Sequence, residues 1–247
     1  MNTLSYTTHD SISLRGAGVV QITQPAKGHR FTLDSLLLAD FCRIRPRNRI
    51  LELGAGTGVV SLLLAKKFPE ARFVAVEAEP GAYKLLCRNI EENGLGGRIV
   101  PVGQDLKYLN RSIAPHAFDI IVANPPYTRT GAGRTSPSLE RQTARQDQTA
   151  PLSAWLDRQG LLKNKGRFFL VFPAQRMVEL ASLLRERNLE PKRIRCVHPY
   201  SDKPASLVLV EAIKTGRTGL EVLPPLIVHG HDGGYSKEVS GIYCSIS

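Results

Sequence analysis

The residues best suited to chemistry in this sequence are Asn124-Pro125-Pro126-Tyr127. They follow Phe118–Ala123, an apolar run whose β-branched residues predict a buried strand, and the prolines end that strand because proline cannot donate to a ladder. Open parallel sheets bind ligands beyond the carboxyl ends of their strands. The tetrapeptide therefore predicts a site that binds a planar amino group through hydrogen bonds. The Asn124 side-chain oxygen and the Pro125 carbonyl would accept the two amino hydrogens, and Tyr127 would stack on the ring.

A glycine-rich turn lies upstream, in Leu51-Glu52-Leu53-Gly54-Ala55-Gly56-Thr57-Gly58. It joins an apolar run to Val59–Lys67, whose spacing and terminal lysines predict a helix that offers unpaired N–H groups. No Gly-Lys-Ser or Gly-Lys-Thr follows, which argues against a nucleoside triphosphate. The glycine spacing and the Glu52 carboxylate argue against a dinucleotide pyrophosphate, but that carboxylate suits the cationic groups of S-adenosylmethionine. The predicted contacts of this ligand are Glu52, Gly54, Ala55, Gly56 and Gly58.

Two more acids follow predicted strands. Glu77, with Ala78 beside it, ends Ala71–Glu77 about 20 residues after the glycines, the distance at which such acids meet ribose hydroxyls. Asp105, with Leu106 beside it, follows Arg98–Gly103 and could accept from an adenine amino group. An acid after a strand is also commonly a helix cap or a solvated turn residue, and that alternative stays open for each.

These motifs resemble the class I S-adenosylmethionine-dependent methyltransferases, and among them those with an Asn-Pro-Pro-Tyr motif that methylate planar nitrogen. The resemblance covers residues 28–213. Within it, Gly28–Ala39 is similar to the start of bacterial tRNA (adenine-N6)-methyltransferases that act next to the anticodon. In that family the segment packs against the cofactor, which implies cofactor contacts for Thr32 and Asp34. An amphipathic helix capped by either residue is the competing interpretation.

The resemblance implies a Rossmann-like α/β fold with a seven-stranded, mostly parallel sheet, helices on both faces and an antiparallel final hairpin. The pattern agrees, because Ile194–His198 and Ser206–Ile213 are two strands too closely spaced for a parallel crossover. Glycines at residues 16 and 18 predict a hairpin within Ser11–Gln24. We also expect helices at Trp155–Leu162 and Gln175–Asn188 and a strand at Arg167–Phe172. The predicted divisions are a β-hairpin extension (1–30), the methyltransferase domain (31–215) and a C-terminal extension (216–247).

The segment 128–150 is polar and too long for an ordinary connection. Its position after the tetrapeptide predicts a basic lip that contacts substrate through Arg129, Arg134 and Arg145, with Arg141 beside them; a plain surface loop is the alternative. The family often has an Ala-Arg-His-Glu-like sequence here. This chain has Ala144-Arg145-Gln146-Asp147, so only Arg145 corresponds and the position of the family's histidine is occupied by Gln146.

Composition indicates the class of partner. The 247 residues include 33 Lys and Arg against 22 Asp and Glu, a net charge of +11 that favours RNA through its phosphates, although a membrane surface would also fit. No apolar stretch is long enough to span a bilayer and the N-terminus lacks a signal-peptide pattern, so we expect a cytoplasmic protein. Cys42, Cys87, Cys196 and Cys244 are isolated, which predicts reduced thiols and no metal site. The sequence leaves the oligomeric state open.

The favoured function is methyl transfer from S-adenosylmethionine to the exocyclic amino group of an adenine in RNA, in tRNA near the anticodon. One alternative is methylation of a protein glutamine amide, as by release-factor methyltransferases, which carry a helical N-terminal domain. Another is methylation of guanine 2-amino groups in ribosomal RNA, usually by duplicated domains, although no internal repeat is visible here. A cofactor-binding RNA module without catalysis is the alternative from a different class.

Overall fold

The computed structural model describes residues 7–26, 31–126, 151–230 and 232–246. Its strands are β1 (Thr7–Leu14), β2 (Gly18–Pro25), β3 (Arg49–Leu53), β4 (Arg72–Glu77), β5 (Ile99–Gly103), β6 (Phe118–Ala123), β7 (Leu162–Pro173), β8 (Leu189–His198), β9 (Leu207–Lys214), β10 (Glu221–Val222), β11 (Leu226–Ile227) and β12 (Tyr243–Ile246). Its α-helices are α1 (Leu33–Phe41), α2 (Val59–Lys67), α3 (Pro80–Glu92), α4 (Leu109–Ser112), α6 (Leu152–Leu156), α7 (Met177–Glu186) and α8 (Lys237–Ile242). Short 3₁₀ helices are Leu106–Tyr108, Asp157–Leu161 and Ala174–Arg176.

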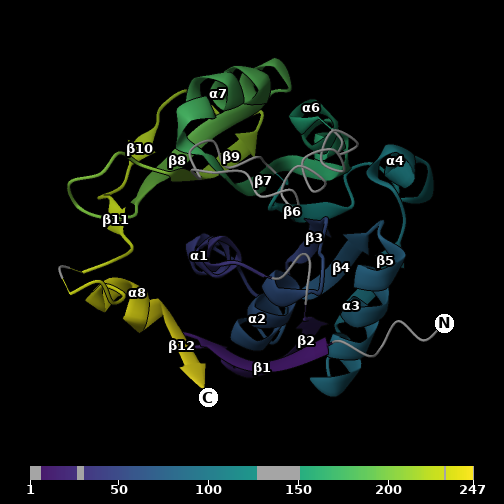
Figure 1. The fold of residues 1–247 in the computed structure, drawn as a ribbon. Coiled ribbons are helices and arrows are strands. Elements are labelled where there is room, and N and C mark those ends of the chain that lie inside the picture. The colour runs from purple at the N-terminus through teal and green to yellow at the C-terminus, as the bar shows by residue number, and fades with distance from the viewer. Residues whose placement is uncertain (1–6, 27–30, 127–150, 231, 247) are drawn as a thin grey trace, which may run out of the picture.

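One twisted sheet organises the molecule, with strand order β10-β8-β9-β7-β6-β3-β4-β5 (Figure 1). The neighbouring strands β5, β4, β3, β6 and β7 all pair in parallel. Strand β9 lies between β7 and β8 and is antiparallel to both. This arrangement confirms the predicted Rossmann-like fold with its antiparallel final pair. The predicted strand number was too low, because β10 and β11 each add two residues beside β8. Such short pairings carry no periodic signal in the sequence.

The apolar runs form central strands because both faces of the sheet are covered. Side chains alternate between the two faces along each strand, so Ile50 packs into one hydrophobic cluster and Leu51 into the other. Helices α1, α2 and α3 cover the first face, and α4, α6 and α7 cover the second (Figure 1). None of the helices in the described residues is both long and apolar enough to cross a membrane.

Several element boundaries follow the prediction and others do not. Strand β6 and helix α2 have the expected bounds, whereas β7 and β8 begin earlier than predicted. The helix expected at Trp155–Leu162 was placed too late, because α6 begins at Leu152 and the chain then tightens into the 3₁₀ helix Asp157–Leu161. Burial of Leu152, Trp155 and Leu156 against the sheet explains this start.

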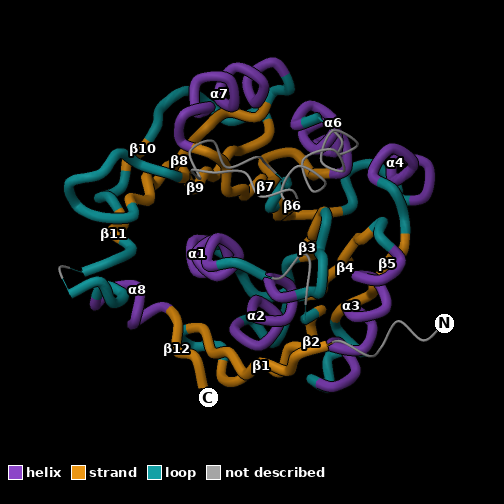
Figure 2. Tube along the Cα trace, viewed as in Figure 1, coloured by secondary structure: helices purple, strands orange, loops and turns teal. Residues whose placement is uncertain are grey.

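A second, three-stranded sheet has the order β12-β1-β2 and packs on the side of α2 and α3 (Figure 2). Strands β1 and β2 form the hairpin expected from the glycines near residue 17, which confirms that prediction. Strand β12 comes from the other end of the chain and pairs antiparallel with β1, with Ile12 opposite Ser245. The segments predicted as two separate extensions therefore contribute strands to one sheet.

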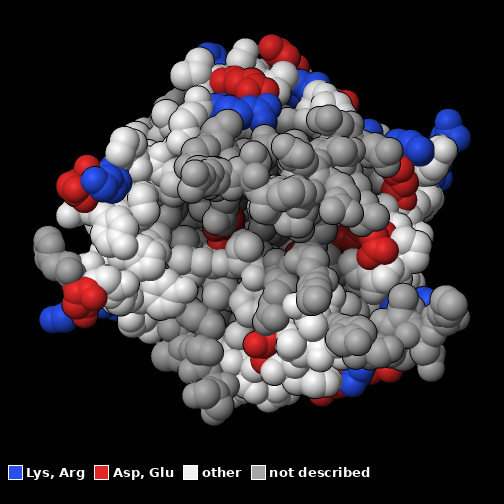
Figure 3. Space-filling view, viewed as in Figure 1, with Lys and Arg blue, Asp and Glu red and all other residues white. Residues whose placement is uncertain are grey.

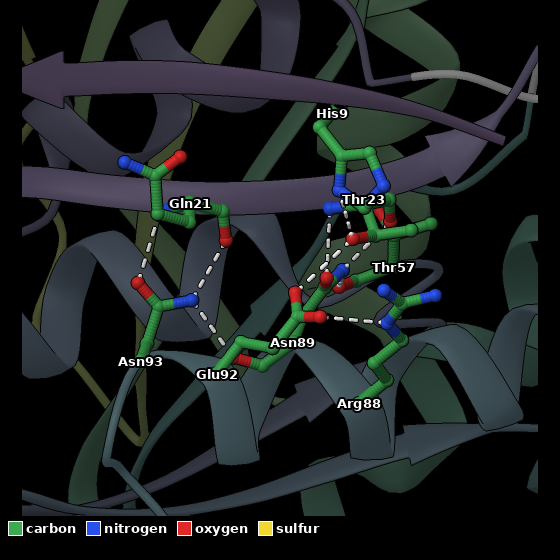
Figure 4. A network of polar contacts seen from close by, with 8 residues as sticks. All are labelled: His9, Gln21, Thr23, Thr57, Arg88, Asn89, Glu92 and Asn93. Carbon is green, nitrogen blue, oxygen red and sulfur yellow. Dashed lines mark hydrogen bonds and ion pairs between the residues drawn. The ribbon is translucent and has the colours of Figure 1, made fainter.

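Asn89 of α3 links this hairpin to the glycine-rich turn (Figure 4). Its side chain is fully buried; Nδ2 donates to the carbonyls of Thr23 (2.9 Å) and Thr57 (2.8 Å), and Oδ1 accepts from the Thr23 N–H at 2.8 Å. One turn further along, Asn93 makes a similar pair of bonds to Gln21, but nearer to solvent. Asn89 thus satisfies backbone groups of β2 and of the glycine-rich turn, two segments that are not hydrogen-bonded to each other as strands.

We expect Asn89→Ala to lower the free energy of unfolding by about 2–4 kcal/mol, because it leaves buried backbone donors and acceptors unpaired. Urea denaturation measures this loss. Asn93→Ala is the matched control and should cost about 1 kcal/mol or less, since water can replace its bonds. Equal losses in the two variants would mean that burial of the Asn89 network is not what stabilises the hairpin.

Candidate cofactor and substrate site

Strand register brings the predicted site residues to one edge of the sheet. Leu53 of β3 lies level with Val76 of β4 and with Ala123 of β6. The residues that follow these three positions are Gly54, Glu77 and Asn124, so all of them emerge at the carboxyl ends of adjacent parallel strands. This is the edge at which sheets of this type bind ligands.

Three glycines of the turn have a left-handed backbone conformation, with φ of +62° at Gly54, +56° at Gly56 and +91° at Gly58. A β-carbon at Gly54 would collide with the ring of Trp155, and one at Gly58 would lie 2.6 Å from Leu86 Cδ1. At Gly56 no described atom lies within 4 Å of that position. Two glycines are therefore required by packing, whereas Gly56 leaves its backbone open to a ligand. Trp155 was not among the predicted site residues, because only the tertiary fold places its ring here.

Glu77 closes the turn from the neighbouring strand. Its Oε2 accepts from the Gly56 N–H at 2.8 Å, and its Oε1 accepts from the Glu79 N–H at 2.8 Å. A carboxylate offers about four lone-pair sites, so each oxygen keeps capacity for a further donor such as a ribose hydroxyl. The open Gly56 backbone beside a half-buried carboxylate fits a nucleoside ligand, and Ala78 is exposed next to it.

Glu52 has a different environment from the one expected. Its side chain is 5% exposed, and Oε2 accepts from the N–H of Ser61 at 3.0 Å and from the Ser61 hydroxyl. Burial raises the pKa of this carboxyl to about 7, although the two Ser61 bonds oppose the shift. The sequence predicted that the first N–H groups of α2 are unpaired. That prediction is wrong for Ser61, because its N–H donates to Glu52. Contact between Glu52 and the cofactor stays a prediction.

Asp105 is exposed and caps the 3₁₀ helix Leu106–Tyr108. Its Oδ1 accepts from the Lys107 N–H at 2.9 Å, and its Oδ2 lies 3.3 Å from Lys107 Nζ. This is the capping arrangement that the sequence offered as an alternative, while Leu106 is buried. Thr32 precedes α1 and is exposed, and its side chain makes no capping bond; Asp34 is buried in the first turn of that helix. The cofactor contacts of these residues stay predictions.

Asn124 projects from the end of β6 towards α1, and its Nδ2 donates to Ser35 Oγ at 3.1 Å. This bond assigns the amide nitrogen to the protein and leaves the amide oxygen to accept from a bound amino group. Pro125 is buried and Pro126 is exposed. Ser35 was missed by sequence reasoning, although it lies in the Gly28–Ala39 segment singled out there. Nothing in that segment distinguishes it from Thr32 or Asp34 without the tertiary contact.

The remaining predicted substrate residues, Tyr127, Arg129, Arg134, Arg141 and Arg145, lie outside the described residues. Among the described residues, basic and acidic side chains both lie around the periphery of the face drawn in Figure 3, and acidic ones are also visible near its middle. No cluster of His, Cys, Asp and Glu suited to a metal ion occurs in the part of the chain that the structure describes.

Comparison with known proteins gives consistent matches. Residues 28–146 match the methyltransferase small domain family. A Porphyromonas gingivalis protein named tRNA1(Val) (adenine(37)-N6)-methyltransferase is 30% identical over 227 residues, covering 88% of each chain. A Vibrio campbellii protein of the same name is 29% identical over 212 residues, covering 85% of each. The structure of an Agrobacterium tumefaciens protein described as a predicted O-methyltransferase superposes with a TM-score of 0.68 at 21% identity, covering 85% of this chain and 94% of the other.

The raised pKa of Glu52 predicts a pH dependence of stability. A carboxyl whose pKa is higher in the folded state stabilises the fold below its ordinary pKa, near 4.3, and this contribution is lost as the pH rises through about 7. Glu52→Gln should therefore be more stable than the wild type at pH 8, by up to about 3 kcal/mol, and the difference should vanish near pH 4.

Urea denaturation at several pH values measures this effect. The control is Glu91→Gln on the exposed face of α3, which should change stability little at any pH. If Glu52→Gln instead destabilises the protein equally at pH 5 and pH 8, the Ser61 bonds to the ionised carboxylate outweigh its burial.

Proposed function

The chain belongs to the family of the tRNA1(Val) (adenine(37)-N6)-methyltransferases, and we propose that it transfers a methyl group from S-adenosylmethionine to the exocyclic amino group of an adenine in tRNA. As a family member it is an S-adenosylmethionine-dependent methyltransferase. The similarity to relatives with this name extends over most of the chain, which supports an adenine next to the anticodon as the acceptor.

One observation carries the proposal: Asn124 stands beside the glycine-rich turn with its amide nitrogen already bonded to Ser35. The exocyclic nitrogen of adenine is a weak nucleophile, because its lone pair is delocalised into the ring. An acceptor fixed opposite its hydrogens would hold the lone pair in line for attack and favour the charge that develops on nitrogen. The Asn124 oxygen and the Pro125 carbonyl are the acceptors that this chain offers.

The other end of the site holds the cofactor. S-adenosylmethionine supplies an electrophilic methyl group on its sulfonium. Gly56 offers an open backbone for the nucleoside part, and Glu77 offers carboxylate oxygens for the ribose hydroxyls. The ionised form of Glu52, which gains weight as the pH rises through about 7, would favour a cation nearby. Tyr127, which ends the tetrapeptide, would stack on the adenine once the base leaves its loop.

The charge of the chain favours RNA over a protein glutamine amide. Its net charge of +11 suits a polyanion, and Arg129, Arg134 and Arg145 would contact the phosphates. A tRNA acceptor implies that the reaction takes place in the cytoplasm.

The proposed function is tested by incubating the protein with labelled S-adenosylmethionine and separate pools of tRNA, ribosomal RNA and release factors. We expect label in tRNA, on adenine N6 after nuclease digestion. Label found only in protein would transfer the proposal to a glutamine acceptor. Bound cofactor with no label in any pool would indicate a binding module without catalysis.

We expect Asn124→Ala to lower the rate of methyl transfer by about a hundredfold or more, because the amino group loses a fixed acceptor. Calorimetry should find S-adenosylmethionine affinity nearly unchanged. Glu77→Ala is the contrasting variant and should weaken cofactor binding by about 1–3 kcal/mol. If Asn124→Ala kept its rate and lost cofactor affinity, Asn124 would be a cofactor ligand and not a grip on the amino group.

Ser35 is expected to position Asn124. Ser35→Ala should lower kcat by roughly tenfold while KM for both substrates and the unfolding free energy change little, since only the orientation of the amide is lost. Ser35→Thr keeps a hydroxyl and should restore most of the rate. In an Asn124→Ala background, Ser35→Ala should have no further effect on kcat. An additive loss in the double variant would show that Ser35 acts independently of Asn124.

A further inference from the structure

Three aromatic rings form a row that the reaction described above does not use. The Tyr200 and His229 ring centroids lie 5.1 Å apart with planes inclined by 31°, and those of His229 and Tyr235 lie 5.7 Å apart at 16°. Tyr200 is 41% exposed and Tyr235 is 46% exposed, although tyrosine usually buries its ring when it can. The row thus presents aromatic surface to solvent at a fixed place.

The backbone holds this row in shape. The N–H groups of Val228 and His229 donate to the carbonyls of His198 (2.8 Å) and Pro199 (2.9 Å), and His229 forms an antiparallel bridge with Tyr235. Three chain segments therefore meet in a small ladder beyond the end of β8, and each contributes one ring. A surface that is already ordered loses little conformational entropy when a partner binds.

The row lies at the same edge of the sheet as the methyl-transfer site. Strands β8 and β6 run in the same direction, because β9 is antiparallel to β8 and to β7, and β7 is parallel to β6. Ile194 of β8 lies level with Ala123 of β6 through the intervening strands. Tyr200 and Asn124 thus both follow carboxyl ends. Three strand spacings of about 4.8 Å separate the two strands laterally by roughly 14 Å. Strand β8 also continues four residues past Ile194, which adds about 13 Å along the strand and brings the separation to roughly 20 Å.

We propose that the Tyr200–His229–Tyr235 row is a stacking surface for nucleotides that flank the methylated adenine, an inference that rests on the proposed function. Access to the amino group requires the adenine to leave its loop, which unstacks its neighbours. The opened loop exposes unpaired bases, and aromatic side chains accept the face of any base without reading sequence. At a stacked rise of about 3.4 Å per nucleotide, roughly six nucleotides reach from the pocket to the row.

Charge favours RNA over a second copy of this chain as the occupant. Two chains of net charge +11 repel each other, whereas a polyanion such as RNA is attracted to the molecule as a whole. Exposed Lys203 and Lys237 lie close in sequence to the two tyrosines, and Lys203 is paired with Asp202 at 3.2 Å. The acidic Glu238 nearby is already paired with Arg195 at 2.7 Å.

The test compares Tyr200→Ala and Tyr235→Ala with Tyr200→Phe and Tyr235→Phe. Fluorescence anisotropy with unmodified tRNA measures binding, and labelled S-adenosylmethionine measures transfer. Each alanine variant should weaken tRNA binding and raise KM for tRNA about tenfold, with kcat and cofactor affinity kept. The phenylalanine variants should stay within about twofold of the wild type, because stacking uses the ring and not the hydroxyl.

Val222→Ala is the matched control, since this side chain is 64% exposed on the outer strand β10 of the same sheet. It should leave tRNA affinity unchanged. Unchanged affinity in folded alanine variants of the tyrosines would overturn the proposal. Light scattering that shows an altered oligomeric mass, with tRNA affinity kept, would assign the row to a subunit interface and also overturn it. If the wild type transfers no label to tRNA, the proposed function fails. The tRNA affinities of the alanine and phenylalanine variants would still show whether the row binds RNA by stacking.

Discussion

Parallel pairing of β3 with β4 and β6 is the constraint on which the site depends. It sets Leu53 level with Val76 and Ala123, so that the glycine-rich turn, Glu77 and Asn124 emerge together. A slip of one residue in either pairing would turn every buried side chain of that strand to the opposite face, and the apolar clusters on both faces resist this. Packing of the two faces therefore fixes the distance between the cofactor pocket and the amino-group grip.

Helix α1 is placed by polar contacts at both of its ends. Ser35 in its first turn accepts from Asn124, and the carbonyl of Phe41 at its last residue accepts from Arg193 Nη2 at 2.7 Å. Arg193 also donates to Glu211 at 2.8 Å and lies 4.1 Å from the centre of the Phe41 ring. Burying this ion pair is tolerable because its hydrogen-bonding groups are satisfied. The strands β8 and β9, remote from the cofactor turn, thereby help to orient the helix that holds Asn124.

The local pattern of the chain predicted the strand, turn and helix around the glycines, because apolar periodicity and glycine placement are local signals. It also predicted that Glu77 and Asn124 lie at strand ends. It could not predict that Trp155 packs on Gly54, that Ser61 bonds Glu52 or that Ser35 bonds Asn124, because each contact joins distant elements. The pairing of β12 with β1 is hidden for the same reason. The sequence could flag the acids, but only the structure separates Glu77, on the open turn, from the buried Glu52 and the capping Asp105.

The amide and carbonyl oxygens of the tetrapeptide are far too weakly basic to remove a proton from an amine before it attacks. Their contribution must come from orientation, for which an error of about 1 Å can cost a hundredfold in rate. Orientation of Asn124 depends on Ser35, Ser35 on α1, and α1 in part on the Arg193–Glu211 pair. The glycine-rich turn is held by other contacts, from Glu77 and Asn89. Displacement of α1 would therefore impair methyl transfer more than cofactor binding, which separates the two halves of the site energetically although they share one edge of the sheet.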